Sequence, residues 1–436
     1  MRPAPPEPRM QDNPLISSNY TGTATRVVAR FHGGRRMLDY TFTEEQEMFR
    51  QSLREYLQKK VVPYLPVMEE KQEIPPEIVK ALAEFELLGP CVTEEYGGPG
   101  MDMIMAGLIG EELGRVDPTA STAVFYLVDA SWSHVFCRYG KEEGKKEILP
   151  DVCKGKKYCG IATTEPDIGS DLANMRTTIK KEGDHFIVNG DKLYISGVRE
   201  ASKMGGGHVT LARQDLAAGT KGMTLFFLPL KDNPGITITV DRELGREGMS
   251  TGGFNMKNVI VPSKYIIGEE NRGFYIVHEG YELARGIISL VCCGAAMKAL
   301  ENGMNYLKQR KAFGRPIGKY EALQFQLAED YTKIQFVRDW AYKALWLYTK
   351  EAREGKANRF EVSKWIAMAK MMAPTWAFEA INHSMQWQGA FGYTWECPEV
   401  KAFRAIRSFT LAEGSTEIMH LIIARELLGR EFIAYK

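Results

Sequence analysis

The segment LAEGSTEIM, residues 411–419, places one carboxylate, Glu413, between apolar residues and a glycine. A carboxylate that loses its hydration has a raised pKa, which brings it toward the range where it can act as a general base. Gly414 lets another molecule approach the backbone closely. Ser415 and Thr416 are good helix caps, however, so Glu413 could instead belong to a helix N-terminus. The residues alone leave both interpretations open.

A second polar segment, ATTEPDIGSD at residues 162–171, follows a run of strand-forming residues. Proline stops the strand, and the glycine, serine and aspartate that follow form a turn. Clustered hydroxyl and backbone N–H groups at the end of a strand can bind the polar edge of a cofactor. The same composition also suits an ordinary surface turn.

These segments belong to a chain whose pattern runs helical, then β-rich, then helical again, which predicts an α+β fold. We expect a leader at residues 1–36, a helical domain at 37–156, a β domain at 157–269 and a helical domain at 270–436. At about 150 residues per domain, 436 residues suit such a division.

Helix signals are clear at both ends of the chain. Thr43 is the expected N-cap of the first helix, because three glutamates follow within its first turn. Further helices are expected at 75–90, 102–115 and 118–139. Long amphipathic segments at 273–310, 322–353 and 361–389 predict a helical bundle.

The β-rich region holds short strands separated by Gly, Asn, Asp and Pro, as in an antiparallel barrel or sandwich. Within it, VNGDK at residues 188–192 is a candidate tight turn, since Asn-Gly favours two-residue hairpin loops.

Composition excludes some classes of function. A net charge of +1 gives no general attraction to nucleic acid. No run of 18 apolar residues occurs, so we expect no membrane span. The seven cysteines have no metal-type spacing, and the histidines are few, so we expect free, mostly buried thiols and no metal site.

Residues 1–36 are rich in arginine, proline and small polar residues. The segment could be a transit peptide, an over-extended start or a cloning remnant. We expect a cytoplasmic protein, or a mitochondrial-matrix protein if the leader is a transit peptide.

Several motifs, in order along the chain, resemble the acyl-CoA dehydrogenase family. They are TEEQEMFRQSLREYL, LLGPCVTEEYGG, ATTEPDIGSD, IVNGDKLYISG, RKAFGRPIG, QGAFGYTWECPEVKAFR and LAEGSTEIMHLIIARELLG. The resemblance covers nearly the whole chain past residue 37. It implies an N-terminal helical domain, a middle antiparallel β-barrel domain and a C-terminal four-helix bundle.

The resemblance also implies FAD as the cofactor and an acyl-CoA as the substrate. Glu413 matches the family's base, which removes the α-proton while a hydride leaves the β carbon for flavin N5. Hydrogen bonds from a flavin ribityl hydroxyl and from the backbone N–H of the base residue stabilise the thioester oxygen.

Cofactor contacts follow residue by residue from the matching motifs. The flavin ring is expected against Ala162, Thr164, Tyr194 and Ser196, where Tyr194 replaces the usual tryptophan. The diphosphate region is expected at Ser415 and Glu417, and the adenosine end at Gln386 and Gly389. Arg310 and Phe313 are expected to reach the FAD of a neighbouring subunit, which implies a homotetramer.

Ser170 is expected beside both the cofactor and the pantetheine arm of the substrate. Gly414, Glu282 and Arg285 are the further substrate contacts that the resemblance implies. Arg285 could equally be a structural ion-pair partner.

The family's acyl pocket corresponds to residues 121–137. Phe125, Tyr126 and Trp132 are bulky there, which argues for a short, cyclic or aromatic acyl group, and no arginine is present for a second substrate carboxylate. Asp129 is either a hydrogen-bonded structural residue or a second acid/base for 1,4-dehydrogenation of a cyclohexene-carboxyl-CoA.

Three functions remain open on this resemblance. The first is a dehydrogenase that passes electrons to an electron-transfer flavoprotein, and the second is a flavin oxidase that uses oxygen. The third is a non-catalytic binding protein, against which the presence of Glu413, Arg310 and Thr164 argues.

Overall fold

The computed structural model describes residues 42–434. These residues fall into two units, 42–47 and 48–434, and the packing described below is that of the second. Helix α2 (Glu44–Lys60) starts in the first unit and continues into the second. The hydroxyl of Thr43 accepts a hydrogen bond from the Gln46 amide at 3.2 Å, and the Gln46 side chain accepts one from the Thr43 amide at 3.0 Å. Thr43 is therefore confirmed as the N-cap. The predicted leader lies outside the described residues.

Short helices follow α2 up to residue 153. They are α3 (Leu65–Lys71), α4 (Pro76–Glu84), α5 (Met103–Val116), α6 (Ser121–Tyr139) and α7 (Glu142–Cys153). The helix expected over 75–90 ends early, because Glu86 and Gly89 have left-handed backbone angles, with φ of 56° and 58°. Asp102 caps α5 by accepting a hydrogen bond from the Met105 amide at 2.9 Å. The predicted helical N-terminal domain is confirmed.

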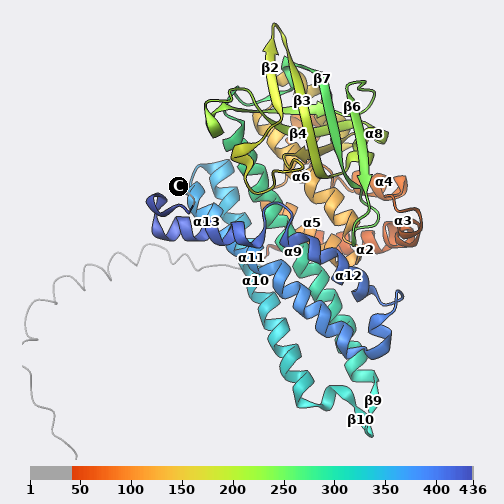
Figure 1. The fold of residues 1–436 in the computed structure, drawn as a ribbon. Coiled ribbons are helices and arrows are strands. Elements are labelled where there is room, and N and C mark those ends of the chain that lie inside the picture. The colour runs from red at the N-terminus through yellow and green to blue at the C-terminus, as the bar shows by residue number, and fades with distance from the viewer. Residues whose placement is uncertain (1–41, 435–436) are drawn as a thin grey trace, which may run out of the picture. The chain divides into compact units, whose positions relative to one another are not determined.

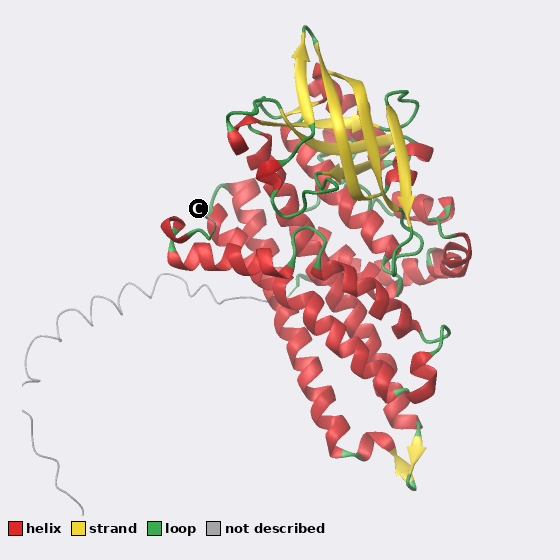
Figure 2. Ribbon diagram, in the orientation of Figure 1, coloured by secondary structure: helices red, strands yellow, loops and turns green. Residues whose placement is uncertain are grey.

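The middle of the chain forms one eight-stranded sheet, coloured yellow in Figure 2. Its strands are β1 (Tyr158–Ala162), β2 (Thr178–Glu182), β3 (His185–Ser196), β4 (Gly206–Arg213), β5 (Met223–Pro229), β6 (Ile236–Asp241), β7 (Thr251–Pro262) and β8 (Ile266–Ile267), with the short helix α8 (Val198–Met204) after β3. The order is β6-β7-β3-β2-β4-β5-β8, and β1 pairs with β4. Closure into a barrel stays a prediction, because this order begins at β6 and ends at β8.

Two expectations for this domain need correction. The sheet is mixed rather than wholly antiparallel, because β1 pairs with β4 in the parallel sense. VNGDK is not a tight turn, because β3 runs straight through it. A register shift against β7 between Val188 and Gly190 takes up the local irregularity instead. Pairing with β7 on both sides of Gly190 keeps the strand extended, and the hairpin turn lies earlier, at Gly183, between β2 and β3.

The last part of the chain is helical, as predicted. It contains α9 (Gly273–Gln309), α10 (Glu321–Glu354), α11 (Arg359–Trp387), α12 (Pro398–Ile406) and α13 (Thr416–Leu428). A small hairpin of β9 (Lys311–Ala312) and β10 (Arg315–Pro316) joins α9 to α10. Helix α9 packs against α10 and α11 and also against α5, and α13 packs on α11. Figure 1 shows the hairpin at the end of α9 and α10 that lies farthest from the sheet.

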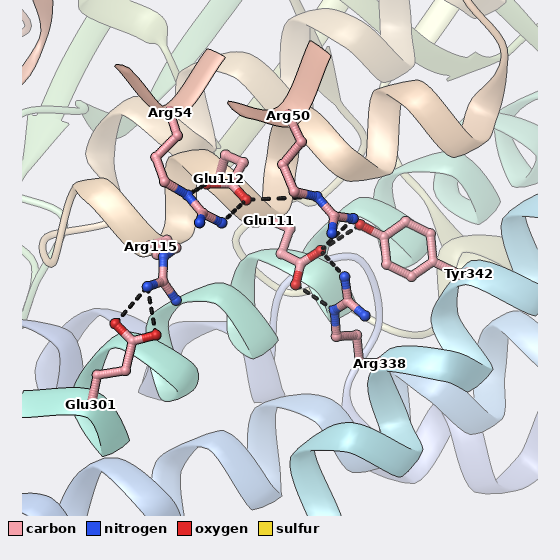
Figure 3. Close-up of polar contacts among 8 residues, drawn as sticks. All are labelled: Arg50, Arg54, Glu111, Glu112, Arg115, Glu301, Arg338 and Tyr342. Atoms are coloured by element: carbon pink, nitrogen blue, oxygen red, sulfur yellow. Dashed lines mark hydrogen bonds and ion pairs between the residues drawn. The ribbon is translucent and has the colours of Figure 1, made fainter. Parts of the chain in front are cut away.

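A network of ion pairs joins α5 to α2 and α10 (Figure 3). The carboxylate of Glu111 accepts hydrogen bonds from Arg338 at 2.5 and 3.1 Å and from the hydroxyl of Tyr342. Next to it, Arg54 donates two hydrogen bonds to Glu112, at 2.8 and 2.6 Å. Both glutamates are buried, so these paired charges offset a large desolvation cost. The network fixes α5, and α5 in turn packs against α9.

Helix α9 is the one helix in residues 42–434 that is long and apolar enough to cross a membrane by length and composition. Its most apolar window has a mean hydropathy of 1.6, and 89% of that window is buried inside the fold. Single polar residues interrupt this helix, so it contains no unbroken run of 18 apolar residues. The seven cysteines are all buried and unpaired, as predicted.

Candidate active site

Glu413 lies in the turn that precedes α13. Its φ is 55° and that of Gly414 is 96°, so two successive residues are left-handed. Such a backbone is costly for a non-glycine residue and is found preferentially at functional sites. The N-cap of α13 is Ser415, whose hydroxyl accepts a hydrogen bond from the Ile418 amide at 3.4 Å. Glu413 therefore does not serve as the cap.

The carboxylate of Glu413 is buried although the residue as a whole is half-buried. Its Oε2 atom has no contact with solvent and no hydrogen-bond partner among the described residues. Burial raises the pKa of Glu413 to about 7, and the charges of Arg285 and Lys370 oppose that rise. A buried acceptor without a partner is costly in a native structure, and at an active site it is the group left available for a substrate.

Two buried cations hold the backbone of this turn. Nε of Arg285, on α9, donates a hydrogen bond to the Glu413 carbonyl at 2.7 Å. Nζ of Lys370, on α11, donates to the carbonyl of Gly414. Neither bond occupies the carboxylate. The turn is thus fixed by its carbonyl groups while the acid side chain stays unpaired, which is the arrangement a general base needs.

An aromatic wall, formed by the rings of Tyr281 and Trp132, lies beside Arg285. Its guanidinium lies 5.4 Å from the centre of the Tyr281 ring, and that ring meets the Trp132 ring edge-on at 5.4 Å. The Tyr281 hydroxyl shares a hydrogen bond of 2.6 Å with the hydroxyl of Thr163, at the end of β1. The strand end found in the sequence therefore lies beside the Glu413 turn.

The residues predicted to contact the flavin ring come together at the ends of β1 and β3. The Leu193 amide donates to the Thr164 carbonyl at 3.0 Å, which sets Thr164 beside Tyr194. Tyr194 is 66% exposed, and its φ of 58° is left-handed. An exposed aromatic face held in a strained backbone suits stacking on a planar ring system. Ser196 is half-buried on β3, and Ala162 is buried at the end of β1.

The remaining predicted cofactor residues lie in three separate places. Ser415 and the exposed Glu417 lie at the N-terminus of α13, where backbone amides favour an anion. Arg310 and Phe313, which is 96% exposed, lie at the β9–β10 hairpin. Gln386 is exposed in the last turn of α11, and Gly389 is exposed just after the helix. Gln386 is 16 residues along α11 from Lys370, or about 24 Å at about 1.5 Å per residue. Gln386 and Gly389 therefore lie at a distance from the Glu413 turn.

Ser170 and Glu282, two of the predicted substrate contacts, differ from each other in their surroundings. Ser170 is exposed in the turn after β1. Glu282 is buried, accepts a hydrogen bond from Ser363, and lies 3.4 Å from Arg359. Burial raises the pKa of Glu282 in spite of those partners. A contact between Glu282 and the substrate stays a prediction, and the structure gives this side chain partners within the protein.

Asp129 is buried in α6, and its Oδ2 accepts a hydrogen bond from the Gly89 amide at 3.0 Å. Burial raises its pKa to about 8 against the effect of backbone hydrogen bonds from Gly89 and Cys159. These contacts tie α6 to the loop after α4 and to β1, and they favour the structural interpretation. Its role as a second acid/base stays a prediction.

Lys370 and Tyr281 were missed in the sequence. The signal for Lys370 was present, because one lysine interrupts the apolar run IAMAKMMA. Nothing in the sequence set Tyr281 apart from other aromatic residues on a long helix. Two cavities, of about 670 and 570 Å³, lie away from Glu413 and are lined by charged residues such as Lys203 and Arg404. We place the site at Glu413 because the unpaired carboxylate and its clamped turn are there.

Comparison with known proteins agrees with this geometry. Models of the N-terminal, middle and C-terminal domains of acyl-CoA dehydrogenases match residues 43–156, 160–259 and 271–428. The chain belongs to the acyl-CoA dehydrogenase family. Among curated relatives, a 3-(aryl)acrylate reductase of Clostridium sporogenes is 31% identical over 89% of this chain and 99% of its own length.

Solved acyl-CoA dehydrogenase structures share the fold over nearly the whole chain. A glutaryl-CoA dehydrogenase bound to glutaryl-CoA has 29% identity and a TM-score of 0.83, with 90% of this chain and 97% of that one covered. A structure described with the electron transferring flavoprotein of Acidaminococcus fermentans has 30% identity and a TM-score of 0.83, with 90% and 100% covered. A glutaryl-CoA dehydrogenase of Mycobacterium smegmatis, 24% identical with a TM-score of 0.79 and 91% and 97% covered, shares the fold and contains FADH2.

The predictions of the enzyme class and cofactor are confirmed at the level of the family. Its members are flavoprotein oxidoreductases that act on acyl-CoA, and solved structures that share the fold are bound to FAD or FADH2. The exposed Tyr194 ring beside Thr164 and the amides at the start of α13 fit the ring and the diphosphate of such a cofactor.

Proposed function

We propose that this protein oxidises a short, cyclic or aromatic acyl-CoA between its α and β carbons, with Glu413 as the base that removes the α-proton. The observation that carries the proposal is the Glu413 carboxylate, which is buried, has an unpaired Oε2, and has a pKa raised to about 7. At that pKa the carboxylate is largely ionised in mildly alkaline solution, yet it holds a proton strongly enough to remove one from a weak carbon acid.

The backbone of the same turn supplies the second requirement. Proton removal from a thioester places negative charge on the carbonyl oxygen, which needs a donor aimed at it. The backbone N–H of Glu413 donates to no other group among the described residues. Arg285 fixes the following peptide group, between Glu413 and Gly414, through the Glu413 carbonyl, and the Glu413 N–H stays available at this turn. We assign it to the thioester oxygen.

FAD is the cofactor that we propose for the chain. Thr164, Tyr194 and Ser196 would hold its ring, and Ser415 and Glu417 its diphosphate region. Bound FAD supplies the acceptor for the two electrons that leave with the β-hydrogen. Arg310, Phe313, Gln386 and Gly389 would bind the cofactor of a neighbouring subunit. A cofactor site completed by a neighbouring subunit is the basis on which we propose a homotetramer.

Our proposal for the size and shape of the acyl group rests on the aromatic wall of Trp132 and Tyr281. Tyr281 lies next to Arg285, and Trp132 lies next to Tyr281. Two such large buried side chains favour a compact acyl group over a long straight chain. The range 121–137 contains no arginine for a second carboxylate. The 3-(aryl)acrylate reductase among the relatives is consistent with an aromatic or other compact acyl group.

An electron-transfer flavoprotein is the proposed electron acceptor, and the structural neighbour described with such a protein supports it. Oxygen is the competing acceptor. The two are distinguished by measuring turnover with each, since an oxidase consumes oxygen and forms peroxide without any added protein.

The test is a substrate panel with the purified flavoprotein. Straight, branched, dicarboxylic, aromatic and alicyclic acyl-CoAs are supplied with a ferricenium acceptor. Exchange of the α-proton with D2O is followed in parallel without any acceptor. Turnover of compact acyl groups together with exchange that requires Glu413 supports the proposal. A colourless protein, or exchange that persists undiminished in Glu413→Gln, contradicts it.

A further inference from the structure

A lysine on α11 has surroundings that a lysine rarely has. Lys370 is completely buried and lies among alanines and other apolar residues of its helix. Among residues 42–434, no carboxylate forms an ion pair with it. Its one hydrogen bond is to a neutral acceptor, the carbonyl of Gly414.

Such a placement costs stability. Moving an ammonium group out of water costs several kcal/mol, and one neutral hydrogen bond does not offset this cost. A second cation, Arg285, adds repulsion, and burial together with Arg285 lowers the pKa of Lys370 to about 7. A methionine at this position would pack in the same helix without the cost. The lysine is therefore not explained by the stability of α11.

The groups that face Lys370 belong to the Glu413 turn and its supports. They are Arg285 and Cys292 from α9, Glu413 from the turn, and Glu417 from α13. Of these, Glu413 is the buried carboxylate with an unpaired oxygen. The charge on Lys370 lowers the pKa of Glu413, and its hydrogen bond fixes the residue that follows Glu413.

We propose that Lys370 is a positioning residue for the Glu413 base. It holds the Gly414 carbonyl and so keeps the left-handed Glu413–Gly414 turn in one conformation. With Arg285 on the preceding carbonyl, two cations from two different helices fix two consecutive peptide groups. When it is protonated, Lys370 also places a positive charge near the Glu413 carboxylate, which favours the ionised form of that carboxylate. The inference rests on the proposed role of Glu413.

The test compares three variants of the FAD-loaded enzyme. Lys370→Met removes both the charge and the donor, whereas Lys370→Gln keeps a neutral donor. Lys364→Met is the matched control, because Lys364 lies on the same helix, is partly exposed, and pairs with Glu361. We measure kcat/KM against pH, exchange of the α-proton with D2O, FAD content, and the melting temperature.

We expect Lys370→Met to keep FAD and to melt at or above the temperature of the parent enzyme, because a buried charge is removed. Its kcat/KM should fall on the order of 10²-fold, the loss expected when a catalytic group is misplaced by about 1 Å. The midpoint of the rise of kcat/KM with pH should move upward, because a cation that favours ionised Glu413 is gone. Lys370→Gln should show the same upward movement with a smaller fall in rate, and the control should change in neither respect.

A folded Lys370→Met enzyme with the parent's rate and pH midpoint overturns the inference. Loss of FAD and of the fold in both Lys370 variants also overturns it, since that result assigns Lys370 to stability. Glu413→Gln separates the two proposals. If that variant retains proton exchange, the proposed function fails. If it loses exchange while Lys370→Met behaves as the parent enzyme does, only the role of Lys370 fails.

Discussion

Replacing Glu413 by glutamine should lower activity and raise stability at the same time. Glutamine keeps the size of the side chain and removes its charge. The pKa of Glu413 is raised in the folded protein from 4.5 to about 7, so the folded state holds the proton more tightly than the unfolded chain does. Above pH 4.5 the carboxyl group therefore destabilises the fold. That cost grows as the pH rises to about 7 and is constant beyond it.

The size of the effect follows from the same two pKa values. The rise from 4.5 to about 7 corresponds to at most about 3 to 4 kcal/mol, at about 1.4 kcal/mol per pH unit. Glu413→Gln should thus be more stable than the parent by at most about 3 to 4 kcal/mol at pH 8 and about equally stable near pH 4.5. Loss of a general base should lower kcat by about 10²- to 10⁴-fold.

The assay is the melting temperature of both FAD-loaded proteins between pH 4.5 and pH 8.5, beside kcat on one substrate. Glu354→Gln is the control. Glu354 is an exposed carboxylate whose pKa is lowered by hydrogen bonds to Lys350 and Lys356, so its loss should slightly destabilise the protein at pH 8. If Glu413→Gln is less stable at pH 8, or if its stability relative to the parent does not change with pH, the carboxylate is paired and the assignment of Glu413 as an unpaired buried base is wrong.

Three further changes test the surroundings of the site. Arg285→Met should move the rise of kcat/KM with pH, expected near 7, to higher pH, because Arg285 lowers the pKa of Glu413; an unchanged midpoint would show that the two charges do not interact. Glu111→Gln should lower stability by about 3 kcal/mol in urea unfolding, because it leaves the charge of Arg338 buried and uncompensated; a loss below about 1 kcal/mol would mean that water replaces the pair. Asp129→Asn should keep its activity, because the amide oxygen can still accept the backbone hydrogen bond; loss of turnover confined to cyclohex-1-ene-carboxyl-CoA would instead support the two-carboxylate mechanism.

Features that depend on near neighbours in the chain were predictable. The capping side chain of Thr43, the helical period that follows it, and the β-rich composition of the middle domain all act over a few residues. The ordered motifs identified the family and Glu413. VNGDK shows where local reasoning failed. Asn-Gly favours a turn in isolation, but β7, more than 60 residues farther along the chain, pairs on both sides of it and keeps the strand extended.

Lys370 and Tyr281 show a second limit. Each lies on a long helix, and although Lys370 interrupts an apolar run, nothing in the sequence relates either residue to Glu413. Their importance arises because α9 and α11 bring them to the turn at Glu413, more than 40 residues beyond Lys370 and more than 130 beyond Tyr281. No spacing rule in the sequence relates such positions, since the relation is made by the packing of helices.

The sequence by itself determined the family, the alternation of helical and β-rich regions, and the choice of Glu413 as the candidate base. These depend on residue types and on short-range order, which the chain carries directly. Only the tertiary structure decided that Ser415 rather than Glu413 caps α13, that the Glu413 carboxylate is unpaired, and that two buried cations hold its turn. The physical reason is that burial and charge pairing depend on which groups displace water around a side chain, and here those groups come from helices far apart in the chain.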